Sequence, residues 1–158
     1  MLVTYCTDYN KNFLKERAIK SIDYPHMIDF SKFYDVSIEN KEFDVLISGQ
    51  MNQHSYPLRT KLAQFFSSNK NKYKICYLPH PGHLKQTVSH RYFGEKYVEL
   101  ASRCKISITC TGDDDALVLK YLEFAKAGTL PLGDCPSNMP ISASQSMIHV
   151  TKNMSDKE

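Results

Sequence analysis

Two acidic residues in the second half of the chain, Asp115 and Glu123, are the strongest candidates for chemistry. The run between them is mostly apolar, and its spacing predicts a helix that begins beside Asp115 and carries Glu123 two turns inside. Helical side chains lean toward the N-terminus of their helix, so Glu123 would reach back toward the helix start. A carboxylate in such a place suits a pair of vicinal hydroxyls, as on a ribose.

A surface ion pair is the alternative interpretation of Glu123. Lys120 precedes it by three residues, and such a pair on an exposed helix face stabilises by only about 0.2–0.5 kcal/mol. The spacing alone favours neither interpretation. For the neighbouring aspartates 113–115, capping of the helix start is favoured over binding of a divalent cation.

The loops that follow apolar runs hold further candidates. Gly49 ends the run 45–49 and Arg59 follows it, whereas His80 follows the run 73–78. In an open parallel sheet, ligands bind beyond the carboxyl ends of the strands, so these loops are expected to be neighbours. The sequence contains neither a GxGxxG after a strand nor a P-loop. His80, His83 and His90 lack a cysteine or carboxylate motif that would complete a zinc site.

The elements that would position these residues alternate along the chain. Strands are predicted over 45–49, 73–78, 105–111, 130–132 and 147–150, and helices over 10–20, 58–66, 94–103 and 114–127. Pro57 suits a first helical turn, and Gly128 suits the position after a last one. The alternation predicts an α/β fold, a Rossmann-like parallel sheet with helices on both faces. Ser155-Asp156-Lys157-Glu158 is a capping box, which predicts a helix just where the chain stops.

The composition is that of one folded domain. The chain has 158 residues, of which 42% are hydrophobic and 23% are charged. A net charge of +3 gives little support for a nucleic-acid partner, and no apolar run is long enough to span a membrane. The first residues lack the pattern of a signal peptide. Five cysteines without a CxxC predict reduced thiols in a cytoplasmic protein.

The run from Asp115 onward resembles the donor-binding signature of retaining glycosyltransferases of the GT-B fold. In that signature an acid is followed after seven residues by a Glu, and then by small residues ending in Gly-Thr, as at Ala127-Gly128-Thr129. Several other stretches are similar to the spore-maturation (CgeB-like) subgroup of group 1 glycosyltransferases: 43–49, Tyr56-Pro57-Leu58-Arg59, 97–108 and Tyr24-Pro25-His26-Met27-Ile28-Asp29. The resemblance extends over residues 24–151.

The resemblance implies a transferase that uses a UDP- or GDP-linked sugar as its donor. Glu123 would bind the ribose hydroxyls, and Asp115 would contact the donor sugar. Basic groups near Gly49 would face the diphosphate. The implied donor-binding set is Asp115, Glu123, Gly128, Thr129, Gly49, Arg59, Lys120 and His80. No metal or other cofactor is expected, because basic side chains and a helix N-terminus can stabilise a departing diphosphate.

The resemblance also implies a division of the chain. Residues 1–44 would lead in from a missing N-terminal acceptor domain, and 45–158 would form half of a GT-B fold, truncated at its C-terminus. No residue presents itself as a general base, so the chain alone would bind the donor without transferring it. The alternative interpretation is a non-catalytic flavodoxin-like or nucleotide-binding module.

Overall fold

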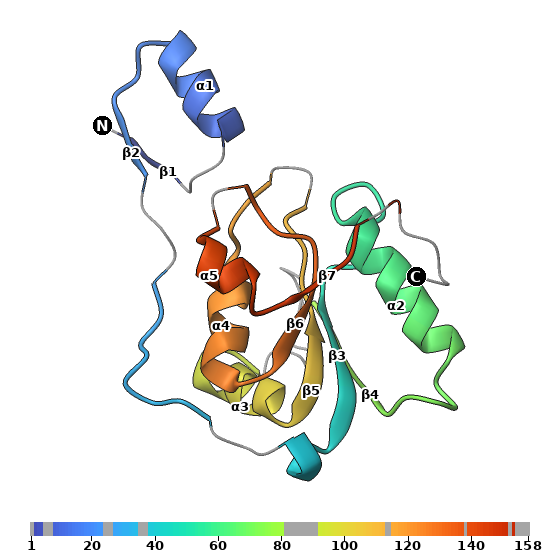
Figure 1. Cartoon of the computed structure of the whole chain (residues 1–158). Coiled ribbons are helices and arrows are strands. Elements are labelled where there is room, and N and C mark those ends of the chain that lie inside the picture. Colours follow the sequence, from blue (N-terminus) through green and yellow to red (C-terminus); the bar gives the residue numbers. More distant parts are fainter. Residues whose placement is uncertain are drawn as a thin grey trace.

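The computed structural model describes residues 2–4, 8–23, 27–34, 38–80, 92–112, 115–137, 139–151 and 153. His83, His90, Asp113, Asp114 and the capping box at 155–158 lie outside the described residues. The elements, in chain order, are β1 (Leu2–Thr4), α1 (Asp8–Glu16), β2 (Ser21–Asp23), the 3-10 turn η1 (Ile38–Asn40), β3 (Phe43–Gly49), α2 (Pro57–Ser68), β4 (Ile75–Pro79), α3 (Glu95–Ser102), β5 (Cys104–Ile108), α4 (Leu119–Ala127), β6 (Leu130–Gly133), α5 (Ile141–Ser144) and β7 (Ile148–His149) (Figure 1).

A five-stranded parallel sheet forms the centre of the fold, with strand order β4-β3-β5-β6-β7. The first of these strands in the sequence, β3, has β4 on one side and β5 on the other. The direction of the chain across the sheet therefore reverses at β3. A crevice opens beyond the carboxyl ends of the strands at such a reversal, and ligands of open α/β sheets bind there.

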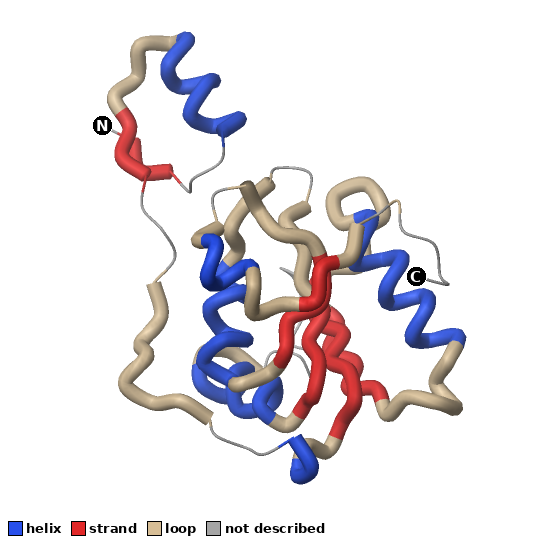
Figure 2. The backbone as a smooth tube through the Cα atoms, viewed as in Figure 1, coloured by secondary structure: helices blue, strands red, loops and turns tan. Residues whose placement is uncertain are grey.

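Helices cover both faces of this sheet (Figure 2). Val45 and Ile47 of β3 pack with Phe66 of α2 on one face. Leu46, between them in the sequence, packs on the other face with residues of α3 and α4, including Phe124. Strands covered on both faces are apolar at consecutive positions, which is why the run 45–47 contains no polar residue. The predicted Rossmann-like α/β fold is confirmed.

The start of α4 differs from the prediction. The helix begins at Leu119 rather than at 114, because Asp115 takes a φ of +50° and Val118 is extended. Asp115 therefore lies four residues before the helix, and Glu123 lies about one turn inside it. The helix ends as predicted at Gly128, whose left-handed φ of +61° suits glycine.

The first part of the chain contains more structure than the helix predicted there. β1 and β2, which precede and follow α1 in the sequence, pair in parallel and form a second, two-stranded sheet. Figure 1 shows this unit standing apart from the five-stranded sheet, with an extended segment between them. A hydrogen bond joins the described part of that segment, 27–34, to the main domain: the Tyr34 N–H donates to the Lys126 carbonyl at 3.1 Å.

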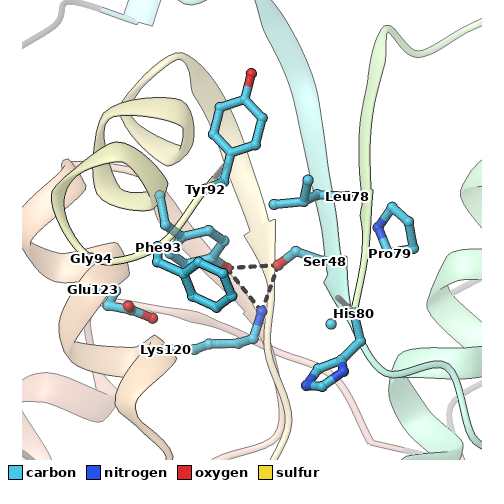
Figure 3. A pocket seen from close by; sticks show the side chains of 11 residues that line it. Ser48, Leu78, Pro79, His80, Tyr92, Phe93, Gly94, Lys120 and Glu123 are labelled. Atoms are coloured by element: carbon cyan, nitrogen blue, oxygen red, sulfur yellow. Dashed lines mark hydrogen bonds between the residues drawn. The ribbon is translucent and has the colours of Figure 1, made fainter. Parts of the chain in front are cut away.

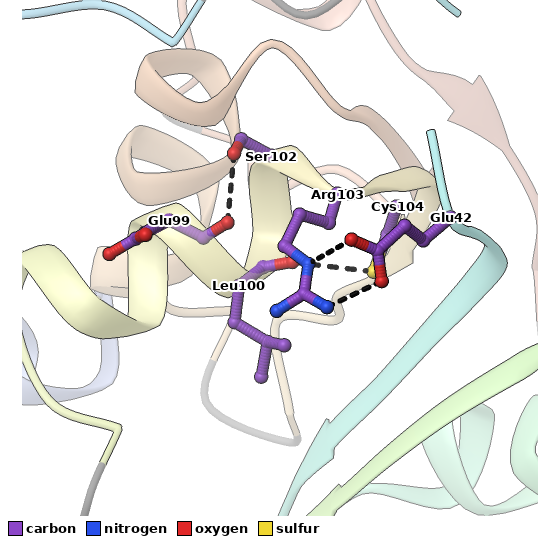
Figure 4. Close-up of polar contacts among 6 residues, drawn as sticks. All are labelled: Glu42, Glu99, Leu100, Ser102, Arg103 and Cys104. Atoms are coloured by element: carbon purple, nitrogen blue, oxygen red, sulfur yellow. Dashed lines mark hydrogen bonds and ion pairs between the residues drawn. The ribbon is translucent and has the colours of Figure 1, made fainter. Parts of the chain in front are cut away.

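An ion pair lies at the edge of the main sheet where its strands begin (Figure 4). Arg103, between α3 and β5, donates from Nε to Glu42 Oε1 at 2.9 Å and pairs through Nη2 with Oε2 of the same carboxylate. This hydrogen bonding lowers the pKa of Glu42 and raises the pKa of Arg103. The pair lies where β3 and β5 begin, at the opposite edge from the crevice.

Candidate functional site

A pocket of about 180 Å³ lies beyond the carboxyl ends of β3 and β4, between these strands and α3 and α4. We call it the Lys120 pocket. Lys120 and Glu123 reach into it from α4, and His80 lies across from them at the end of β4 (Figure 3). Aromatic residues just before α3, Tyr92 and Phe93, form part of its wall. The structure thus brings together four of the predicted site residues, Gly49 at the end of β3 together with His80, Lys120 and Glu123.

The ammonium group of Lys120 is held by two hydroxyls. Nζ donates to Ser48 Oγ at 2.6 Å and to the Tyr97 hydroxyl at 2.9 Å, and these two oxygens lie 2.7 Å apart (Figure 3). No carboxylate of the described residues is hydrogen-bonded to it. Burial, followed by the positive charge of Arg59, lowers the pKa of Lys120 from 10.5 to about 7. The positive charge of Lys120 is therefore held by neutral hydroxyl groups and not by a hydrogen-bonded carboxylate of the described residues.

Arg59 is a second cation close to partly buried Lys120, and it is itself buried. It stands in the first turn of α2 with 3% of its surface exposed, and no carboxylate in the described part of the chain pairs with it. Nη1 donates to the Gln50 carbonyl at 3.3 Å, and the guanidinium lies 4.3 Å from the centre of the Tyr56 ring. Nε is buried without a hydrogen-bond partner. Removing a charge from water without an ionic partner is costly, so such an arginine calls for an anion.

The two cations converge on Gly49. This residue has a φ of +95°, which disfavours any side chain. A Cβ at this position would stand 3.2 Å from Arg59 Nη1 and 3.3 Å from Lys120 Nζ. Because glycine has no side chain, both cationic groups can lie close to the backbone at the end of β3. Like charges repel, so this arrangement is more favourable with an anion between them.

Glu123 supplies the acidic side of the pocket. Only 9% of the residue is exposed, and burial raises the pKa of its carboxyl, although nearby Lys120 acts in the opposite direction. The interpretation as a surface ion pair is therefore wrong. No side chain among the described residues donates a hydrogen bond to this carboxylate. A buried carboxylate with unused acceptor positions suits a ligand that brings hydroxyl groups.

Asp115 lies outside the Lys120 pocket. The Ser137 N–H donates to its carboxylate at 3.1 Å and the Ser137 hydroxyl donates as well. Asp115 lines a different cavity of about 360 Å³ near the start of α2, together with Asp134. The expectation that a single helix start joins Asp115 to Glu123 is corrected, because the irregular turn before Leu119 separates them.

Gly128 and Thr129 stand at the opposite end of α4 from the pocket. The Gly128 carbonyl accepts from Lys41 Nζ at 2.8 Å, and Thr129 Oγ1 lies 2.9 Å from Ser107 Oγ in the sheet. These contacts end the helix and join it to β6. Neither residue lines the pocket that contains Glu123, and their membership of the donor-binding set stays a prediction.

Ser48 and Tyr97 are pocket residues that were not predicted as such. Ser48 is the first polar residue after the apolar run of β3, and that interruption is the available signal. Tyr97 is a core residue of α3 with 7% exposure. Its hydroxyl nevertheless reaches the pocket, and no sequence pattern indicates that contact.

No protein-family model matches this chain. A search of curated proteins finds no significant match either.

Within the described residues, no group of three or more His, Cys, Asp and Glu side chains is placed to hold a metal ion. No described helix is long and apolar enough to cross a membrane. Cys76, Cys104, Cys110 and Cys135 are free thiols, whereas Cys6 lies outside the described residues.

Proposed function

We propose that this chain is the donor-binding domain of a glycosyltransferase and that the Lys120 pocket holds a nucleotide-sugar. The observation that carries the proposal is the convergence of two cations, the buried Arg59 and the partly buried Lys120, on Gly49. A diphosphate has the charge to compensate both of them, and guanidinium and ammonium groups are common ligands of phosphate oxygens. The resemblance to GT-B donor domains supports the choice of ligand.

Glu123 gives the proposal its second part. The carboxylate and Lys120 lie one turn apart on α4, in the same pocket. A ribose next to a diphosphate would place two hydroxyls near the carboxylate, which can accept a hydrogen bond from each. His80 and Phe93, from the walls of the pocket, would contact the base or the sugar. Asp115, which hydrogen-bonds to Ser137, has no part in this arrangement.

The domain would contribute to transfer chiefly through charge. When the bond between sugar and diphosphate breaks, negative charge develops on the leaving phosphate. Cations already held beside the leaving group stabilise this charge without reorganisation. We expect binding without transfer by this chain, since an acceptor domain and a general base would come from a preceding domain.

A flavodoxin-like module is the second candidate, and one observation favours it. Numbered from β3, the strand order of the main sheet is 2-1-3-4-5, the order of flavodoxin-like folds, in which FMN binds at the reversal point. Two neighbouring cations and an acceptor carboxylate suit a diphosphate followed by a ribose better than they suit FMN. For this reason we favour the nucleotide-sugar.

Calorimetric titration of the full chain with UDP-glucose, GDP-mannose, FMN and Mg²⁺ separates the two candidates. We expect one of the nucleotide-sugars to bind, and saturation at about 100 times its Kd would stabilise the fold by about 2.7 kcal/mol. Glu123→Gln and Arg59→Met should each weaken binding about tenfold or more, whereas Lys70→Met, at an exposed position, should not. Binding of FMN or Mg²⁺ with no response to either nucleotide-sugar would overturn the proposal.

A further inference from the structure

The two cations beside Gly49, Lys120 in the pocket and Arg59 next to it, differ in one chemical respect. A guanidinium keeps its charge at every physiological pH, but an ammonium can release its proton. In the empty protein, the repulsion between them is therefore relieved by loss of the proton from Lys120, whose pKa is lowered to about 7 by burial and by Arg59. At neutral pH a large fraction of Lys120 is a neutral amine.

We infer that the pocket binds its anion together with one proton, which Lys120 accepts, so that anion affinity rises as the pH falls. This inference deepens the proposed function and rests on it for the identity of the anion as a diphosphate. Anion binding and protonation of Lys120 favour each other. An anion between the two cations favours the charged form of Lys120, and the charged form in turn favours the anion. Gly49 contributes because the absence of a side chain lets both nitrogens lie close to the same backbone position.

Titratable groups face Lys120 from each element around the pocket: Arg59 from α2, Tyr97 from α3, Glu123 from α4, Cys110 from the segment after β5 and His80 from the end of β4. Burial raises the pKa values of Tyr97 and Cys110, so both stay uncharged near neutral pH. Glu123, with its raised pKa, loses a proton as the pH rises and would then repel an anion. His80 also lines the pocket, so it needs its own control.

The size of the effect follows from linkage. While the amine is neutral in the empty protein and charged in the complex, each pH unit lowers the affinity by about tenfold. This regime begins above the midpoint of the empty protein, about 7, and ends at the midpoint of the complex. Between pH 6 and pH 8.5 we therefore expect affinity to fall by about ten- to thirtyfold.

Nuclear magnetic resonance of the full chain with ¹³C-labelled lysine tests this directly. The Cε signals are followed from pH 5.5 to 10 with and without sulfate, a probe whose own charge is constant over this range. One lysine should titrate near pH 7, vanish from the spectrum in Lys120→Arg, and titrate at higher pH when sulfate is added. Sulfate should bind Lys120→Arg with little dependence on pH, since a guanidinium keeps its proton.

Three control variants assign the effect. Glu123→Gln and His80→Gln should keep most of the pH dependence, and Lys70→Met should keep all of it. An equal sulfate affinity at pH 6 and 8.5, or a Lys120 midpoint that sulfate leaves unchanged, would overturn the inference. Nucleotide-sugars provide the separate arm. If sulfate shifts the midpoint but UDP-glucose and GDP-mannose do not bind at pH 6, the linkage holds and the proposed function fails.

Discussion

Replacing Lys120 with methionine should stabilise the empty protein although it removes a residue of the site. The side chain carries a cation into a pocket next to Arg59, and methionine has a similar apolar stem without the charge. Ser48 Oγ and the Tyr97 hydroxyl lie 2.7 Å apart, so they keep a hydrogen bond to each other when Nζ is gone. The variant therefore leaves no orphaned hydroxyl.

The expected gain follows from the pKa of Lys120. A pKa of about 7 in the folded protein against an ordinary 10.5 corresponds to a penalty of about 4 kcal/mol at pH 7. Loss of the two hydrogen bonds from Nζ costs about 2–3 kcal/mol in return. The free energy of unfolding of Lys120→Met should thus exceed that of the wild type by about 1–2 kcal/mol at pH 7.

The direction in which the stability difference changes with pH tests this prediction separately. Between about pH 7 and 10.5 the unfolded chain binds more protons at Lys120 than the folded chain does. Wild-type stability therefore rises with pH across this window as far as this residue is concerned, and Lys120→Met lacks the rise. The advantage of the variant should be largest at and below pH 7 and should shrink toward pH 10.

Urea denaturation followed by circular dichroism at pH 6, 7, 8 and 9 measures both effects. Lys70→Met, at an exposed position, should match the wild type at each pH. Added sulfate should stabilise the wild type more than the variant, because only the wild type has both cations. A variant less stable than the wild type at pH 6, or an advantage that stays constant from pH 6 to 9, would refute the reasoning.

Three other substitutions test the packing and charge around the site. Gly133→Ala should destabilise the fold by about 3 kcal/mol or more in thermal denaturation, because its Cβ would stand 1.9 Å from the Thr109 carbonyl oxygen. Gly128→Ala should cost about 1–2 kcal/mol, since its φ is +61° and the Tyr34 carbonyl would lie 2.9 Å from the new Cβ. Glu123→Gln should remove a decline in stability above pH 4.5, because the folded protein, with the raised pKa, holds that proton longer than the unfolded chain.

Much of the fold follows from local pattern. The apolar runs that became β3, β4 and β5 are bounded by glycine, proline or polar residues, and the helices between them carry apolar residues at helical spacing. These signals depend on neighbours in the sequence, so they predict both the elements and their alternation. Gly128 ends α4 for a similarly local reason, its left-handed backbone.

The beginning of α4 shows where local pattern is insufficient. Three consecutive aspartates precede an apolar run at helical spacing, and that spacing predicts a helix over 114–127. Ser137, distant in the sequence, donates two hydrogen bonds to Asp115 and holds it in an irregular turn. A contact between residues so far apart leaves no periodic pattern, so the position of Asp115 could not be predicted.

The sequence by itself determined the α/β class, the order of elements and the importance of Glu123, Lys120, Arg59 and Gly49 as candidates. Only the tertiary structure decided which of them meet. Arg59 and Lys120 belong to helices on opposite faces of the sheet, and they converge because both helices begin at the carboxyl edge beside the central strand β3. Gly128, in the same sequence motif as Glu123, lies away from the pocket. A helix rises about 1.5 Å per residue, so the last residues of α4 lie nearer the other edge of the sheet.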